Sequence, residues 1–110
     1  MLRIRAPGFV LALLLCGAAR AQEPLTIALV IKDHAFSPAE LHVPAGKPII
    51  IAIDNQDATA EEFDSTDLQI EKVIAGGRKG VVHLRALQPG RYSFIGEYHA
   101  ETAQGVVVAE

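Results

Sequence analysis

The sequence has 110 residues, of which 50% are apolar and 21% are charged, with a formal net charge of −3 at pH 7. This length allows one domain, and the high apolar content argues against an intrinsically disordered chain. No cluster of Lys and Arg extends beyond Arg78 and Lys79, so we expect no nucleic-acid partner. Because Trp is absent and aromatic residues make up 5%, the core must be built from Val, Ile, Leu and Ala.

The first 21 residues have the pattern of a secretory signal peptide. Two arginines precede an eleven-residue apolar segment at 9–19, and the small residues Ala19 and Ala21 form a cleavage site. A bilayer takes about 20 apolar residues to cross, so this segment is too short to span a membrane. We therefore expect residues 1–21 to be a signal peptide and residues 22–110 to be an exported, soluble domain.

The one cysteine, Cys16, lies within this predicted signal peptide. A lipid anchor on Cys16 is the alternative, but Leu15 stands where a lipoprotein signal needs a small residue. The mature domain then has no thiol, and it contains 7 Lys and Arg residues and 13 Asp and Glu residues. It must be held together without disulfides, and its net charge of −6 suits it to attract cations.

The rest of the sequence is typical of β-strands separated by turns. The expected strands are, in chain order, residues 25–32, 41–43, 48–53, 68–74, 81–86, 91–95 and 106–109. Residues 54–60 form a polar loop, and three consecutive isoleucines in 48–53 predict a strand buried on both faces. About seven strands with regularly spaced turns predict an all-β Greek-key β-sandwich. Tyr92, which follows the Pro89-Gly90 turn, fits the tyrosine corner of such sandwiches.

Three motifs, in this order and at these spacings, resemble those of cupredoxins. They are Phe-Ser-Pro to Pro-Ala-Gly at 36–46, Ile-Ala-Ile-Asp-Asn at 51–55, and Leu-Gln-Pro-Gly-Arg-Tyr-Ser-Phe at 87–94. The resemblance covers nearly all of the mature domain and implies a cupredoxin-like sandwich.

Blue-copper cupredoxins hold their metal with two His, a Cys and often an axial Met. Carried over by resemblance, these positions are Glu61, Gly96, His99 and Gln104 in this sequence. Because Gly96 replaces the Cys and the mature domain has no thiol, a type 1 copper centre is excluded by composition. The remaining carboxylate, imidazole and amide donors suit copper(II), iron, manganese or zinc better than copper(I). Of these metals we expect copper(II) or iron.

Strand alternation places Glu61 on the same face as Phe63, which predicts that Glu61 points inward. A register slip of one residue would exchange Glu61 with Glu62, so both stay candidate metal ligands with His99 and Gln104. Three further glutamates lie close enough in the sequence to be alternatives: Glu71, Glu97 and Glu101. We expect the other histidines to be surface residues: His34, His42 and His83.

The glutamate in place of the first histidine, with the segments 61–65 and 99–105, resembles the EfeO-type cupredoxin-like domains of bacterial iron uptake. This resemblance implies a periplasmic metal-binding protein, not an enzyme, that handles copper or iron. Its expected partner is a membrane iron permease or a periplasmic iron-binding protein. The alternative is a metal-free β-sandwich that docks on a membrane permease or an oxidase. A ferroxidase acting at the carboxylates is a third hypothesis.

Overall fold

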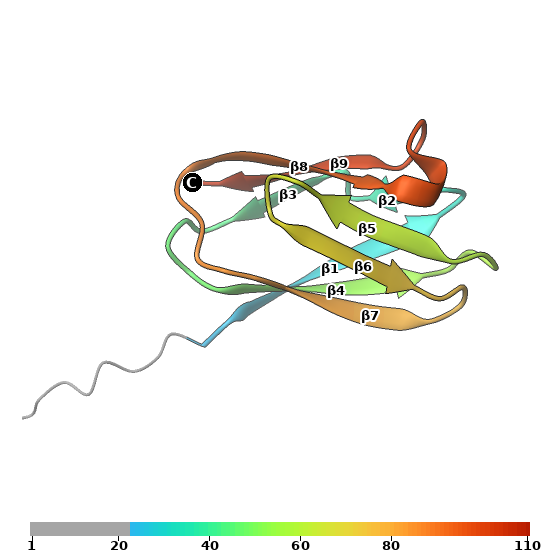
Figure 1. Cartoon of the computed structure of the whole chain (residues 1–110). Helices are drawn as coiled ribbons and strands as arrows, with labels where there is room; N and C mark the ends of the chain where they lie inside the picture. Colours follow the sequence, from blue (N-terminus) through green and yellow to red (C-terminus); the bar gives the residue numbers. More distant parts are fainter. Residues whose placement is uncertain (1–22) are drawn as a thin grey trace, which may run out of the picture.

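The computed structural model describes residues 23–110, and the predicted signal peptide with its cleavage site lies outside the described residues. This part of the chain folds into nine β-strands and one 3-10 turn (Figure 1). The elements are β1 (Leu25–Lys32), β2 (Ala35–Ser37), β3 (Glu40–Val43), β4 (Ile49–Asn55), β5 (Glu61–Ser65), β6 (Ile70–Ile74), β7 (Lys79–Leu84), β8 (Gly90–Gly96), η1 (Glu97–His99) and β9 (Gln104–Ala109). Within residues 23–110, no helix is long and apolar enough to cross a membrane.

The strands form two sheets that pack face to face. One sheet has the order β2-β1-β4-β7 and the other has the order β3-β9-β8-β5-β6. Side chains alternate along each strand, so one face of each sheet is buried in a core rich in Leu, Ile and Val. Three phenylalanines, Phe36, Phe63 and Phe94, pack edge-to-face or stacked within this core.

The predicted all-β sandwich is confirmed, but the prediction of about seven strands is corrected to nine. The two additional strands are β2 and β5. The first has only three residues, and the second contains two glutamates and an aspartate, which are depleted in strands. Pairing with β6 and β8 makes β5 a strand despite this composition.

The three isoleucines of β4 do not form a strand buried on both faces. Ile49 and Ile51 are buried in the core, whereas Ile50 and Ala52 on the opposite face are half-buried. The opposite face is the outer surface of the β1-β4-β7 sheet, which no other described element covers. The sheet therefore keeps an apolar outer surface.

The two ends of the sandwich are held by different polar contacts. At the end where β8 begins, the Tyr92 hydroxyl donates a hydrogen bond to the carbonyl of Gln88 (2.8 Å), which confirms the tyrosine corner. At the other end, the fully buried Asn55 donates to the carbonyls of Thr59 and Ile74 and accepts from the amide of Asp57. Asn55 thus shapes the β4–β5 loop, which lies beside the candidate site.

Candidate functional site

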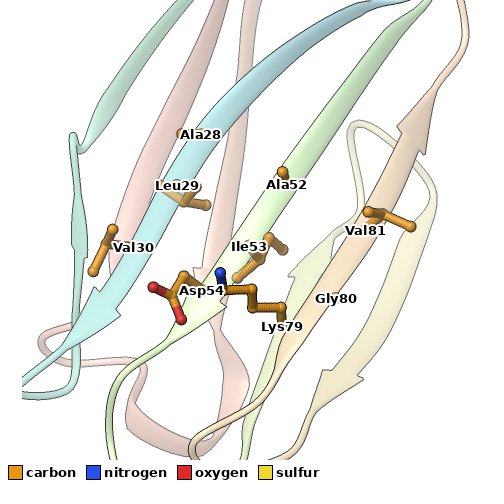
Figure 2. A pocket seen from close by; sticks show the side chains of 9 residues that line it. All are labelled: Ala28, Leu29, Val30, Ala52, Ile53, Asp54, Lys79, Gly80 and Val81. Carbon is orange, nitrogen blue, oxygen red and sulfur yellow. The ribbon is translucent and has the colours of Figure 1, made fainter.

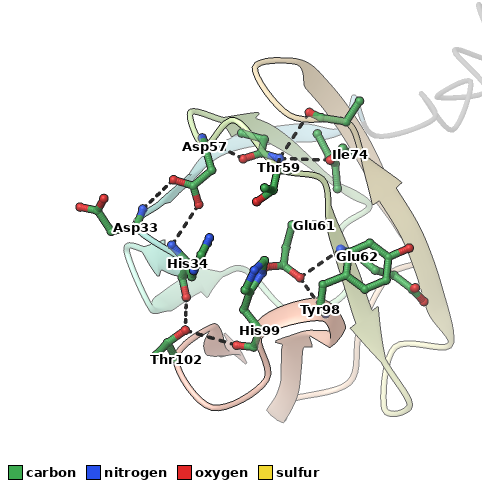
Figure 3. A network of polar contacts seen from close by, with 12 residues as sticks. Asp33, His34, Asp57, Thr59, Glu61, Glu62, Ile74, Tyr98, His99 and Thr102 are labelled. Atoms are coloured by element: carbon green, nitrogen blue, oxygen red, sulfur yellow. Dashed lines mark hydrogen bonds and ion pairs between the residues drawn. The ribbon is translucent and has the colours of Figure 1, made fainter.

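Glu61 is the most buried carboxylate among the described residues, with 1% of its surface exposed. Its Oε2 lies 2.5 Å from Nδ1 of His99, and its Oε1 accepts hydrogen bonds from the amides of Tyr98 (3.0 Å) and Glu62 (3.2 Å) (Figure 3). A buried anion needs this number of donors to compensate for lost hydration. The η1 turn supplies two of the donors, because it follows directly after β8 and crosses the start of β5.

The contact with Glu61 determines which ring nitrogen of His99 keeps a free lone pair. A carboxylate that accepts from Nδ1–H leaves the lone pair of Nε2 free in the neutral ring. The His99 side chain is 23% exposed, and its Nε2 has no hydrogen-bond partner among residues 23–110. It lies at a shallow depression of about 430 Å³, lined by His34, Tyr98, His99, Ala100, Glu101 and Thr102. No buried side-chain nitrogen or oxygen among the described residues lacks a hydrogen-bond partner, so the unpaired Nε2 is accessible to solvent. Glu61 therefore orients His99 and leaves Nε2 accessible.

His34 lies against His99, although the two residues are far apart in the sequence. Their rings stack with centroids 3.6 Å apart and planes inclined by 13°. His34 sits in the turn between β1 and β2 with a left-handed φ of 57°. Its amide donates to Asp57 (2.9 Å), and its carbonyl accepts from the hydroxyl of Thr102 (2.5 Å). Contacts from two other loops thus hold the backbone that carries this ring (Figure 3).

Asp57 is the residue that ties the β4–β5 loop to the β1–β2 turn. Its two carboxylate oxygens accept from the amides of Asp33 (2.8 Å) and His34 (2.9 Å). The hydrogen bond from the His34 amide is the main cause that lowers the pKa of Asp57. Desolvation is the next largest effect and opposes this bond, whereas the hydrogen bond from the Asp33 amide and the nearby imidazoles of His34 and His99 lower the pKa further.

The space at Gly96 shows why the type 1 copper ligands do not fit. A Cβ on Gly96 would lie 2.6 Å from Cδ of Glu61 and 2.6 Å from Cβ of Ala103. The backbone of Gly96 is extended, with φ −90° and ψ 105°, so the glycine is required for space and not for conformation. The Glu61 carboxylate fills the volume that a thiolate would need. This structure therefore cannot accommodate the cysteine ligand of a blue copper site.

The other predicted site residues lie elsewhere. Gln104 is exposed and donates to the carbonyl of Ala100 (3.0 Å), because alternation at the start of β9 turns Ala103 inward and Gln104 outward. Glu62 lies on the outer face of β5. Glu97 and Glu101 are exposed near His99 without contacting it. Of the four predicted ligands, the structure brings together only Glu61 and His99.

The outer face of β5 and β6 carries a group of carboxylates that we call the acidic strip: Glu62, Asp64 and Glu71. These residues can each place a carboxylate oxygen within 4.8 Å of the others. Desolvation raises the pKa of Glu62, and repulsion from Glu71, Asp64 and Glu97 raises it further. The alternative ligand Glu71 therefore belongs to this strip and not to the Glu61–His99 pair.

The position of His34 beside His99 was not predicted from the sequence. His34 is exposed, as expected for a surface histidine, yet its ring covers that of His99. The one signal was Asp33-His34 itself, which ends the apolar run of 25–31 and marks a turn. Nothing in the local sequence indicates which residue this turn will contact.

The chain belongs to the cupredoxin-like domain family, whose model matches residues 7–109. An uncharacterized protein of Rickettsia prowazekii (strain Madrid E) is 39% identical over 84 residues, which cover 76% of this chain and 67% of that protein.

Solved structures show the same fold at lower identity. Auracyanin A, a "blue" copper protein of Chloroflexus aurantiacus, is 20% identical with a TM-score of 0.69, over 80% of this chain and 100% of that chain. The metal-binding domain of the Cu(I)-exporting ATPase CopA of Streptococcus pneumoniae is 17% identical with a TM-score of 0.62, over 77% and 84% of the two chains. These structures show that the chain shares its fold with copper-binding proteins.

A second surface feature lies on the outer face of the β1-β4-β7 sheet. Residues of three neighbouring strands line a hollow of about 560 Å³. Figure 2 shows the side chains that line it. Its floor is apolar because Ala28, Ala52 and Val81 stand side by side in the register of these strands. Asp54 and Lys79 are its charged lining residues, and Val81 is 48% exposed. This hollow offers a contact surface and has no metal-binding chemistry of its own.

Proposed function

We propose that this chain is an exported cupredoxin-like protein that binds copper(II) or iron through His99, without a type 1 copper centre. The observation that carries the proposal is the buried Glu61 carboxylate, which holds the Nδ1 side of His99 and leaves Nε2 toward solvent. Histidine ligands of metals usually donate their other N–H to a carboxylate in this manner. Glu61 is thus a positioning residue, and a bound cation would supply Lewis acidity or redox chemistry at Nε2.

The resemblance to EfeO-type domains extends this proposal to iron uptake. In this function the protein binds its metal in the periplasm and hands it to a membrane iron permease or a periplasmic iron-binding protein. Imidazole, water and carboxylate donors suit copper(II) and iron, and the acidic surface attracts cations. A partly exposed histidine is suited to exchange metal with a partner, so we propose binding and transfer rather than catalysis.

Calorimetric titration of residues 22–110 with copper(II), and with manganese(II) in place of the air-sensitive iron(II), tests the proposal. We expect binding of about one equivalent that is lost in His99→Ala. His83→Ala is the matched control, because His83 is exposed on β7 away from this site. Absence of binding to the unmodified protein, or full binding to His99→Ala, would refute the proposal.

The apolar hollow favours a second candidate function, a metal-free module that docks on a membrane permease or an oxidase. An acidic side chain in the hollow, as in Val81→Glu, would then abolish cross-linking to the partner, whereas His99→Ala would not affect it. The reverse pattern would exclude docking through this face.

A further inference from the structure

We propose that His34 and His99 together form a two-imidazole site for copper(II). This inference rests on the proposed metal-binding function and names the second protein ligand of the same site. It differs from the family-based ligand set, in which the second donor would be Glu61, Glu62 or Gln104.

Glu61 is poorly placed to coordinate a cation. Both of its carboxylate oxygens already accept hydrogen bonds, one from His99 and the other from two backbone amides. Oε1 already accepts two hydrogen bonds, and the remaining lone pair of Oε2 lies in a residue that is only 1% exposed. A cation from solvent could reach this lone pair only if the surrounding donors moved away, which would leave them without partners and cost free energy. The carboxylate therefore acts through His99, and the second protein ligand must come from the solvent side.

His34 provides an imidazole on the solvent side of His99. Its ring is exposed and stacked on His99 at 3.6 Å, and neither ring nitrogen of His34 has a hydrogen-bond partner among the described residues. Its backbone is fixed at both its amide and its carbonyl, by Asp57 and Thr102. The turn is thus rigid where it positions the side chain, while the ring itself is free to rotate.

The stacked arrangement places the two rings close together but does not point their lone pairs at one cation. A rotation of the exposed His34 ring about its side-chain bonds, which takes picoseconds to nanoseconds for exposed residues, directs a nitrogen toward Nε2 of His99. Copper(II) prefers imidazole donors in a tetragonal arrangement completed by water, and it binds nitrogen sites more tightly than the other first-row divalent ions. Two neighbouring imidazoles at a solvent-exposed depression fit that preference.

Pulsed electron paramagnetic resonance of the copper(II)-loaded domain counts coordinated imidazoles directly. We expect two in the unmodified protein and one in His34→Asn. Asparagine is chosen because it tolerates the left-handed backbone of position 34. Calorimetry of the same variant should show copper(II) binding weakened by about tenfold or more, the loss typical when a group supporting a metal site is removed. His83→Asn is the matched control and should change neither result.

The outcomes separate this inference from the proposed function. One coordinated imidazole in the unmodified protein, or unchanged affinity in His34→Asn, overturns the two-imidazole site and leaves binding at His99 intact. No copper(II) binding by the unmodified protein refutes the proposed function itself. Because the imidazole count is made on the unmodified protein, it decides the question even where the variant fails to fold.

Discussion

Glu61 and Glu62 are consecutive residues of β5, yet they belong to two different regions of the molecule. Glu61 points into the sandwich, where His99 and two amides surround its carboxylate. Glu62 points outward into the acidic strip, where desolvation and then repulsion by like charges raise its pKa. The face of the strand, and not the residue type, therefore decides whether a carboxylate supports the fold or is repelled by its surroundings.

Alanine substitution of each glutamate is the strongest way to test this comparison. Glu61→Ala leaves two amide donors and His99 without their acceptor, so we expect a loss of about 3 kcal/mol in the free energy of unfolding. Glu62→Ala should change stability little, because it removes a repelled charge from the surface. Urea unfolding of both variants measures the difference, and Glu61→Gln should recover part of the loss. Equal losses for the two variants would contradict the comparison.

Gly96→Ala tests the packing around the buried Glu61 carboxylate, whereas Glu61→Ala tests its hydrogen bonds. Its Cβ would lie 2.6 Å from both Glu61 and Ala103, so we expect a loss of about 1–3 kcal/mol from overpacking. Gly80→Ala is the control, because the nearest atom to its Cβ is a flexible side-chain carbon of Ile74 at 3.1 Å. Thermal unfolding should show a clearly larger effect at position 96. A melting temperature of Gly96→Ala equal to that of the control would mean that Glu61 does not fill this space.

Asp57→Ala should loosen the turn that carries His34 and cost about 1 kcal/mol at neutral pH. Since the folded state lowers the pKa of Asp57, its stabilising effect is complete above the ordinary pKa of an aspartate. That effect is lost as the pH falls through the lowered value. Unfolding measured from neutral to acidic pH should therefore show the variant and the unmodified protein converging in acid. Asp54→Ala, whose carboxylate accepts from the exposed Gln56 side chain, is the control. A difference that grows in acid would contradict this assignment.

The smallest expected effect belongs to the acidic strip. Glu71→Gln removes one of the charges that raise the pKa of Glu62, so this pKa should fall toward its ordinary value. Because the raised pKa means that ionised Glu62 is disfavoured in the folded state, the variant should gain slight stability at neutral pH. The gain should disappear in acid, where Glu62 is protonated. A carboxyl NMR titration of Glu62 measures the shift, and an unchanged titration would show that Glu71 does not act on it.

The regular parts of the molecule could be predicted from the sequence because strand alternation has a fixed period. That period favoured Glu61 for the buried face, although a register slip of one residue left Glu62 as an alternative, and the structure places Glu61 inward. The cupredoxin-like motif placed Gly96 at the same end of the core, and the turn at Pro89-Gly90 identified the tyrosine corner. The irregular parts could not be predicted in the same way. The position of His34 depends on Asp57, a residue of another loop. The register in which β9 follows the η1 turn sets the phase of its alternation, so that Ala103 faces the core and Gln104 faces outward.

A side chain at position 96 and the Glu61 carboxylate would occupy the same space. This constrains the order in which single substitutions could convert a thiolate site into the Glu61–His99 pair. Starting from a thiolate at position 96, a glutamate at position 61 would meet an occupied space, so the glycine has to come first. The intermediate then has an empty volume and no metal-binding thiol, and the later glutamate fills it. While that carboxylate is in place, a side chain at position 96 is disfavoured, so a thiolate could be accommodated there only after a smaller residue has replaced Glu61.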